Sequence, residues 1–120
     1  MANTGAHELV QKSLVGEALE HGPMAIFVAD ENGRYIAVNA YACKLLGYTR
    51  DELLGLHLSE VAVNPGALED FDEMRRNRRR AGTTVLRHRD GSELAMNFRA
   101  SETTVGGMPL YIGICWLDDD

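Results

Sequence analysis

The 120-residue sequence predicts a single α+β domain, with an antiparallel sheet and helices packed on one of its faces. Two observations predict this class. Apolar residues recur with a helical period near the N-terminus and with a period of two in later stretches of the chain. Asn-Gly and Asp-Gly pairs stand between such stretches, which indicates hairpins. The expected order is one helix, two strands, three or four short helices and three strands.

An amphipathic helix is expected over residues 7–21, because apolar residues recur there every four positions. These positions are Val10, Leu14 and Ala18. The pair Gly22-Pro23 ends the helix, since glycine fits the left-handed position and proline cannot continue a helix. We therefore expect a flanking N-terminal helix in residues 1–22 and one folded domain in residues 23–120.

Five strands are expected, because five stretches alternate between apolar and other residues. They cover residues 25–30, 34–38, 83–89, 92–101 and 110–117. An Asn-Gly turn joins the first two, and an Asp-Gly turn joins the next two. A two-residue turn at Asp-Gly would pair Val85 with Met96. This register directs Val85 into the core and Leu86 outward.

The remaining helices are expected between the second and third strands. Asn39 can cap a helix over residues 40–46, and Thr49 forms a capping box with Glu52. A longer helix is expected over residues 67–80, with acids first and arginines last, in agreement with the helix dipole. Its arginines are Arg75, Arg76, Arg78, Arg79 and Arg80. A solvated dipolar helix is the simpler interpretation, and a site for an anionic ligand or partner is the alternative.

Composition excludes several classes of protein. The net charge is −6, from 18 acidic and 12 basic residues, which argues against a dedicated nucleic-acid binder. The sequence has no apolar run long enough to span a membrane and no signal peptide, so we expect a cytoplasmic location. The two cysteines cannot form a disulfide framework. No nucleophile elbow, phosphate loop or metal motif is present in the sequence, so we expect neither catalytic residues nor a metal site.

Three segments of the chain, taken together and in order, resemble the PAS domain, a family of sensor and signalling modules. They are AIFVADENGRYIAVNAYACKLLGYTRDELLG, HRDGSELAMNFRAS and GGMPLYIGI. The resemblance runs from about residue 20 to residue 118. It implies a sheet with the strand order 2-1-5-4-3. It also implies a cytoplasmic module that regulates an effector outside this chain, such as a histidine kinase, a cyclase or a transcription regulator.

The resemblance further implies a pocket for a small ligand between the sheet and the helices. Residues from the strands and from the helical segments are expected to point into it. They are Phe27, Ala29, Val38, Leu46, Leu58, Val61, Phe71, Met74, Val85, Met96, Phe98, Tyr111 and Cys115. Small residues inside the sheet (Ala29, Ala100 and Gly113) and flexible methionines favour a cavity. A plain packed core is the alternative.

The coloured cofactors of the family are not expected. The light-sensing branch uses a cysteine in an Asn-Cys-Arg-Phe-Leu-Gln motif, and the corresponding stretch here, LHLSEVAV, has no cysteine. The haem branch has an axial histidine on the long helix, and residues 67–80 contain none. His57 is the only, weak candidate for a haem ligand. The resemblance therefore implies a small, largely apolar ligand that the sequence does not name.

Alternation along the central strands predicts a second apolar surface, on the outer face of the sheet. Strand residues and residues of the first helix are expected to form it. They are Val10, Leu14, Ala18, Ile26, Val28, Ile112, Ile114 and Trp116. Such a patch is larger than a monomer usually leaves exposed, so we expect the first helix and a second protomer to cover it in a homodimer. A ligand-free module for dimerisation or partner binding is the alternative function.

The chain departs from the family at its C-terminus. The family's fifth strand usually leads into an Asp-x-Thr signature, which would fall at Leu117 and Asp119, where the chain reads WLDDD. The usual coupling residues are therefore absent or shifted by one position. We expect either a module cut from a longer protein or a stand-alone one.

Overall fold

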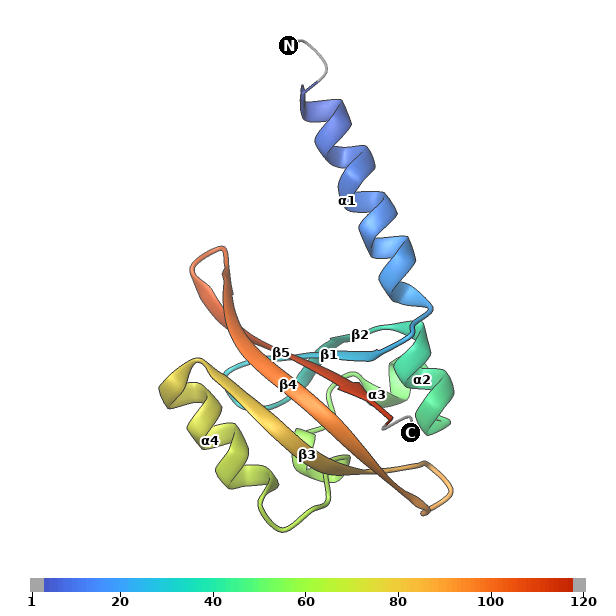
Figure 1. Ribbon diagram of the computed structural model, residues 1–120, viewed down its shortest axis with the longest axis vertical. Helices are drawn as coiled ribbons and strands as arrows, with labels where there is room; N and C mark the ends of the chain where they lie inside the picture. The colour runs from blue at the N-terminus through green and yellow to red at the C-terminus, as the bar shows by residue number, and fades with distance from the viewer. Residues whose placement is uncertain (1–3, 118–120) are drawn as a thin grey trace.

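The central element of the fold is a five-stranded antiparallel sheet with the order β2-β1-β5-β4-β3 (Figure 1). It is seen in a computed structural model that describes residues 4–117. The strands are β1 (Ala25–Ala29), β2 (Tyr35–Val38), β3 (Arg79–Arg87), β4 (Glu93–Val105) and β5 (Met108–Trp116). The predicted α+β class and strand order are confirmed. Asp119, the outermost residues of the expected domain limits and the end of the WLDDD segment lie outside the described residues.

Helices cover the inner face of this sheet. They are α2 (Ala40–Leu46), α3 (Arg50–Leu53), the 3-10 helix η1 (Leu58–Glu60) and α4 (Ala67–Asn77). The capping box is confirmed, because the Glu52 amide donates to Thr49 Oγ1 over 3.1 Å and the Thr49 amide donates to Glu52 Oε1 over 2.8 Å. The side chains of Leu46, Leu53 and Val61 are fully buried between these helices and the sheet. No helix among residues 4–117 is long and apolar enough to cross a membrane.

The long helix is shorter than the sequence predicts. α4 ends at Asn77, Arg78 has a left-handed backbone with φ of 64°, and β3 begins at Arg79. Arg79 therefore pairs with Ser101 in the sheet instead of extending the helix. The physical reason is that β4 runs on to Val105, so its ladder offers hydrogen bonds that outweigh the charge pattern favouring a helix.

The β3–β4 hairpin has a different register from the predicted one. Its loop has three residues, because the His88 amide donates to the Ser92 carbonyl oxygen over 2.8 Å and Gly91 adopts a positive φ of 94°. Asp90 Oδ1 accepts hydrogen bonds from the amide and hydroxyl of Ser92, which stabilises the longer loop. The shift by one residue turns Leu86 inward, where it is 3% exposed.

The first helix, α1 (Thr4–Glu20), is present as predicted but projects away from the domain (Figure 1). Within the described chain it covers no part of its own sheet, and Val10 and Leu14 are 55% and 59% exposed. The expectation that it packs on the sheet of the same chain is therefore wrong. Its apolar side chains also lie on more than one side, since Leu9 and Leu14 are about 140° apart around the helix axis.

The C-terminal end of α1 is nevertheless fixed to the domain by polar contacts, which we call the α1 anchor. The buried Asn39 side chain donates through Nδ2 to the carbonyl oxygens of Leu19 (2.6 Å) and Met24 (2.9 Å). Glu20 accepts hydrogen bonds from the Ala40 amide and from Arg50 Nη2, the latter over 2.5 Å. The Glu20 carboxylate thus lies at the N-terminus of α2, where the helix dipole favours a negative charge.

Candidate functional site

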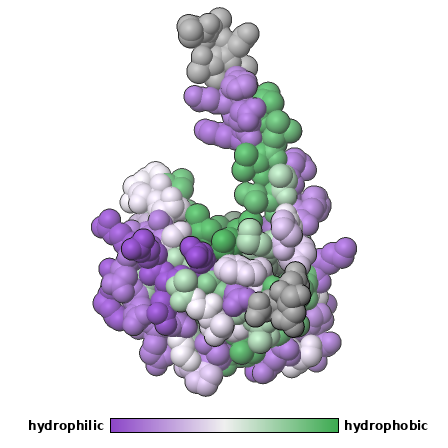
Figure 2. All heavy atoms as spheres, in the orientation of Figure 1, coloured by the Kyte–Doolittle hydropathy of each residue, from purple (hydrophilic) through white to green (hydrophobic). Residues whose placement is uncertain are grey.

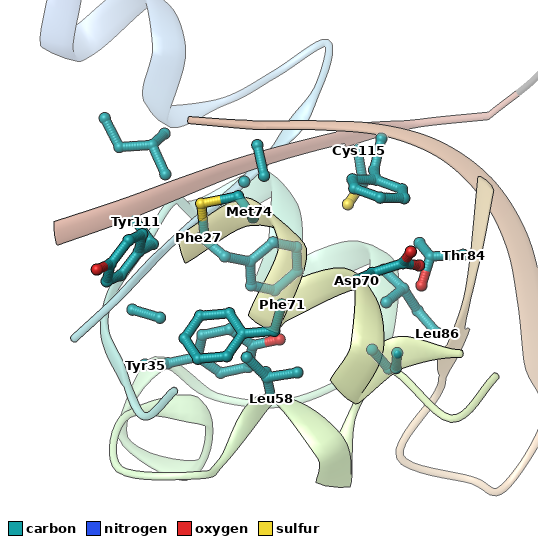
Figure 3. Close-up of a pocket in the computed structure, with 17 residues that line it drawn as sticks. Phe27, Tyr35, Leu58, Asp70, Phe71, Met74, Thr84, Leu86, Tyr111 and Cys115 are labelled. Carbon is teal, nitrogen blue, oxygen red and sulfur yellow. The ribbon is translucent and has the colours of Figure 1, made fainter. Parts of the chain in front are cut away.

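A cavity of about 120 Å³ lies between α4 and the inner face of the sheet (Figure 3). Eight of the residues expected to face a pocket line it: Phe27, Ala29, Leu58, Phe71, Met74, Phe98, Tyr111 and Cys115. The remaining lining residues are Tyr35, Ala62, Ala67, Asp70, Thr84, Leu86, Ala100, Ile112 and Gly113. The cavity therefore takes contributions from all five strands, η1 and α4.

The cavity exists because two small residues stand next to each other in the centre of the sheet. Ala100 of β4 pairs with Gly113 of β5, and Gly113 pairs with Phe27 of β1. Directly opposed residues in an antiparallel sheet share a face, so this row points toward α4. Among the described residues, no atom lies within 4 Å of the position that a Cβ at Gly113 would occupy. The missing side-chain volume leaves the space beneath α4 open.

The lining is apolar and largely aromatic. The rings of Phe71 and Tyr111 meet edge to face, with centroids 5.6 Å apart, and those of Phe27 and Tyr35 are tilted, with centroids 5.1 Å apart. Figure 3 shows the oxygen atoms of Asp70 on the β3 side, away from these rings. The interior therefore favours apolar contacts, with polar groups at one edge.

Burial raises the pKa of one cysteine and two tyrosines in the lining, which favours their neutral forms. Burial raises the pKa of the Cys115 thiol to about 12, so the thiolate is not populated near neutral pH and the thiol is a poor nucleophile. Burial also raises the pKa of Tyr35, and the pKa of Tyr111 is raised by burial and then by the neighbouring Glu102. Asp70 is the only carboxylic acid among the described lining residues.

Five predicted pocket residues do not line the cavity. Val38, Leu46, Val61 and Met96 are buried in the surrounding core, where neighbouring side chains fill the space around them. Val85 was expected to face inward and does not, because the three-residue loop shifts the β3 register by one residue.

Two of the lining residues that the sequence analysis missed, Leu86 and Tyr35, were missed for related reasons. Leu86 replaces Val85 as the inward residue of β3. Tyr35 faces inward because the β1–β2 register shifts at Val28 and Ala29, which leaves Ile36, the inward position under strict alternation, 46% exposed. For Leu86 the signal in the sequence was Ser92, directly after Asp-Gly, because its amide and hydroxyl stabilise the longer loop. The bulge at Tyr35 has no comparable signal.

The family model of the PAS domain matches residues 23–118. This chain belongs to the PAS domain family. Similar solved structures include a PAS domain from a two-component sensor histidine kinase (18% identity, TM-score 0.78, 90% of this chain and 96% of that chain). They also include the PAS domain of an HTR-like protein from Haloarcula marismortui, with 21% identity and a TM-score of 0.76. That match covers 96% of this chain and 98% of the other chain. A domain of a sensory box sensor histidine kinase/response regulator from Geobacter sulfurreducens is similar as well, with 25% identity and a TM-score of 0.70. That match covers 90% of this chain and 96% of the other chain. Among curated proteins no match was found.

PAS domains are sensory and signalling modules and are generally not catalytic, and the predicted family membership is confirmed. The cavity of this PAS domain does not suit the family's large cofactors. Its volume is well below the roughly 300–1,000 Å³ of pockets for drug-sized ligands, so neither haem nor a flavin ring fits it as it stands.

His57, the weak haem candidate, does not line the cavity of this PAS domain. It caps η1, with its Nδ1 accepting a hydrogen bond from the Ser59 amide over 3.1 Å. The described lining residues include no histidine. Within residues 4–117, no three His, Cys, Asp or Glu side chains lie close enough together to hold a metal ion.

The outer face of the PAS sheet carries the second predicted surface. Ile26 pairs with Ile114 and Val28 with Ile112, so these four side chains form neighbouring rows on the outer face, and each is half-buried. Trp116, at the next outer position of β5, is half-buried as well. We call these five residues the outer patch. Val10, Leu14 and Ala18 of α1 are exposed, and Figure 2 shows apolar side chains along α1 and near its base.

Proposed function

We propose that this PAS domain is a sensor module that binds a small, neutral, apolar molecule between α4 and the sheet. The observation that carries this proposal is the apolar cavity of about 120 Å³. An engineered apolar cavity of roughly 150 Å³ in another protein stays dry and binds benzene or xenon. A molecule of about the size of one aromatic ring is therefore the matching ligand class.

The polar groups at the edge of the cavity support a neutral ligand over an ion. Asp70, at that edge, already accepts a hydrogen bond from Arg80 Nε over 3.1 Å. The Thr84 hydroxyl already donates to Asn64 Oδ1 over 2.8 Å. A charged ligand would lose its hydration without gaining a free partner of opposite charge, which costs free energy.

The proposed signal is a shift of packing that reaches the outer face of the sheet. Gly113 lines the cavity, and its neighbours Ile112 and Ile114 belong to the outer patch on the same strand. A ligand that favours one position of α4 or β5 shifts the population of both faces together. We propose that the outer patch and α1 carry this shift to an effector, such as a histidine kinase, a cyclase or a transcription regulator. Two of the similar structures come from histidine kinases.

Filling the cavity tests the binding function. Gly113→Val adds side-chain atoms where the described structure leaves room, and removing a strand glycine favours folding by about 0.5–1 kcal/mol. We expect the wild-type protein to bind fluorobenzene in a ¹⁹F NMR titration and Gly113→Val to lose binding while remaining at least as stable. Native mass spectrometry of the purified protein would reveal a retained metabolite.

The matched control is Gly16→Ala, at an exposed position of α1 with open space around it, which should leave binding unchanged. Equal binding by wild type and Gly113→Val would show that the cavity is not the site. No binding by either protein, and no retained metabolite, would refute the sensor proposal.

The alternative is a ligand-free module whose function is to pair with a second copy of the chain. The outer patch and the exposed α1 favour it, because one chain carries both an uncovered apolar helix and an uncovered apolar sheet face. The charges beside them are complementary. Glu17 lies one turn from Leu14 on α1, and Arg99 is exposed next to Ile114 on the outer face.

A charge swap tests this pairing. We expect the wild-type protein to sediment as a dimer at tens of micromolar, and Glu17→Arg or Arg99→Glu to weaken the dimer. The double swap should restore it, and Arg76→Glu on the exposed end of α4 should have no effect. A wild-type monomer, or single swaps without effect, would contradict the proposed interface.

A further inference from the structure

An ion-pair cluster joins the edge strand β3 to α4 beside the cavity. Arg80 Nη2 and Nε lie 3.0 and 3.1 Å from Asp70 Oδ1, and Arg80 Nη1 lies 3.2 Å from Glu73 Oε2. Asp70 and Glu73 are three residues apart on α4, so they share one side of that helix. Asp70 also lines the cavity. We call this cluster the Arg80 latch.

The sheet register explains why the latch stands at this place. Arg80 pairs with Ala100, and Ala100 pairs with Gly113, so the three residues form one row on the inner face. Ala100 and Gly113 belong to the cavity lining and have almost no side chain. Arg80 is therefore the long side chain at the β3 end of that row, and it rises toward α4.

The next inner-face position along β3 is a glycine. Gly82 lies between Arg80 and Thr84, has no side chain, and is exposed. The nearest atom to a Cβ built at this position is Phe98 Cε1, at 3.4 Å, so an added side chain would start in ordinary contact with the Phe98 ring. At Gly82, β3 therefore contributes no side chain to the wall between α4 and β3, and we call this position the gap. The latch lies on one side of the gap and the lining residue Thr84 on the other.

We propose that neutral small molecules enter and leave the cavity between α4 and β3 at Gly82, and that the Arg80 latch controls how often this route opens. The proposal rests on the binding function proposed above. The latch is partly exposed, with Arg80 and Glu73 side chains 41% and 43% accessible, and such ion pairs contribute little to stability. It can therefore break and re-form while the domain stays folded.

The opposite wall of the cavity offers a less favourable route. Phe27 and Tyr35 are buried there and pack ring against ring, with Leu58 also buried beside the cavity. Opening that side would separate close-packed apolar side chains, whereas opening the β3 side separates solvated charges. The difference in packing assigns the entrance to the β3 side.

Exchange of fluorobenzene, followed by ¹⁹F magnetisation transfer between the free and bound signals, tests the route with two opposite variants. Arg80→Gln removes the latch charge, and we expect association and dissociation rates both to rise about two- to fivefold, the factor that corresponds to a lost exposed ion pair. Gly82→Leu narrows the gap, and both rates should fall. The Kd should change little in either variant, because neither residue lines the cavity.

Salt and a matched variant complete the test. Raising the ionic strength should accelerate exchange in the wild type but not in Arg80→Gln, because salt screens the latch. Arg79→Gln, which changes the neighbouring arginine on the outer side of the same strand, should leave both rates unchanged.

The outcomes separate the entrance from the binding function. Binding with wild-type rates in both Arg80→Gln and Gly82→Leu would overturn the entrance and leave the binding function standing. A changed Kd with an unchanged association rate would also overturn the entrance proposal, because that result would show that Arg80 and Gly82 contact the bound ligand. No fluorobenzene binding by the wild type or any variant, with no metabolite retained by the purified protein, would overturn both proposals.

Discussion

Replacing Asn39 tests the α1 anchor most directly. Its side chain makes four hydrogen bonds. Nδ2 donates to the carbonyl oxygens of Leu19 (2.6 Å) and Met24 (2.9 Å), and Oδ1 accepts from the amides of Ile26 (3.0 Å) and Ala42 (3.0 Å). One side chain thereby joins the end of α1, the start of β1 and the first turn of α2. Asn39→Ala removes all four bonds and leaves their partners unsatisfied.

The expected loss follows from this count. A hydrogen bond contributes about 0.5–1.5 kcal/mol net, and loss of an N-cap side chain alone costs about 1 kcal/mol, so Asn39→Ala should cost about 3–4 kcal/mol. Asn39→Asp keeps the acceptor for Ile26 and Ala42 but directs an oxygen, often charged, at the carbonyl oxygens of Leu19 and Met24. At neutral pH it should be at least as damaging as alanine. Its deficit relative to wild type should shrink in acid, where a protonated carboxyl group can donate.

Urea denaturation followed by circular dichroism measures the effect. For an m-value of about 1.5–2 kcal/mol per molar, a loss of 3–4 kcal/mol lowers the midpoint by about 2 M urea. Asn77→Ala, at the exposed end of α4, is the control and should shift the midpoint very little. A shift below about 0.5 M for Asn39→Ala, or an aspartate variant more stable than the alanine variant at neutral pH, would refute the reasoning.

Three further predictions concern the core and two titrating groups. Leu46→Ala should lower the free energy of unfolding by about 2–5 kcal/mol in urea titrations, because the Leu46 side chain is fully buried. The Cys115 thiol, with its pKa raised by burial to about 12, should resist iodoacetamide at about pH 8 in the folded protein and react once urea unfolds it, as followed by mass spectrometry. The Thr49 amide and then Arg89 hold the pKa of Glu52 below its ordinary 4.5. Its stabilising contribution is therefore present above about pH 4.5 and lost as the pH falls through the lowered pKa, so Glu52→Gln should show a smaller fall in Tm between about pH 6 and about pH 3.

Local chemistry made much of the fold predictable. Asn39 and the pair Thr49 and Glu52 are helix-capping residues whose preference for these positions is strong, and both caps are found where the sequence places them. The alternation of β5 correctly separates inward Tyr111 from outward Ile114, because a strand of nine residues without a bulge keeps a period of two.

The wrong predictions concern strands in which a register shift of one residue moves every side chain to the other face of the sheet. Nothing in strict alternation distinguishes a two-residue from a three-residue loop at Asp90, and the choice decides whether Val85 or Leu86 faces the core. The sequence also could not separate cavity-lining side chains from packed ones. Leu46 and Phe98 are both apolar and inward, and only the three-dimensional placement of Ala100 and Gly113 determines where the empty space lies.

The contrast between the two ends of α1 has a mechanical consequence. The helix has 17 residues and one end held by Asn39, Glu20 and Arg50, while the rest extends beyond the domain (Figure 1). A helix of this length is about 25 Å long, so a tilt of about 5° at the α1 anchor displaces its far end by about 2 Å. A displacement too small to disturb the core is thus magnified into one large enough to alter side-chain packing against a neighbouring molecule.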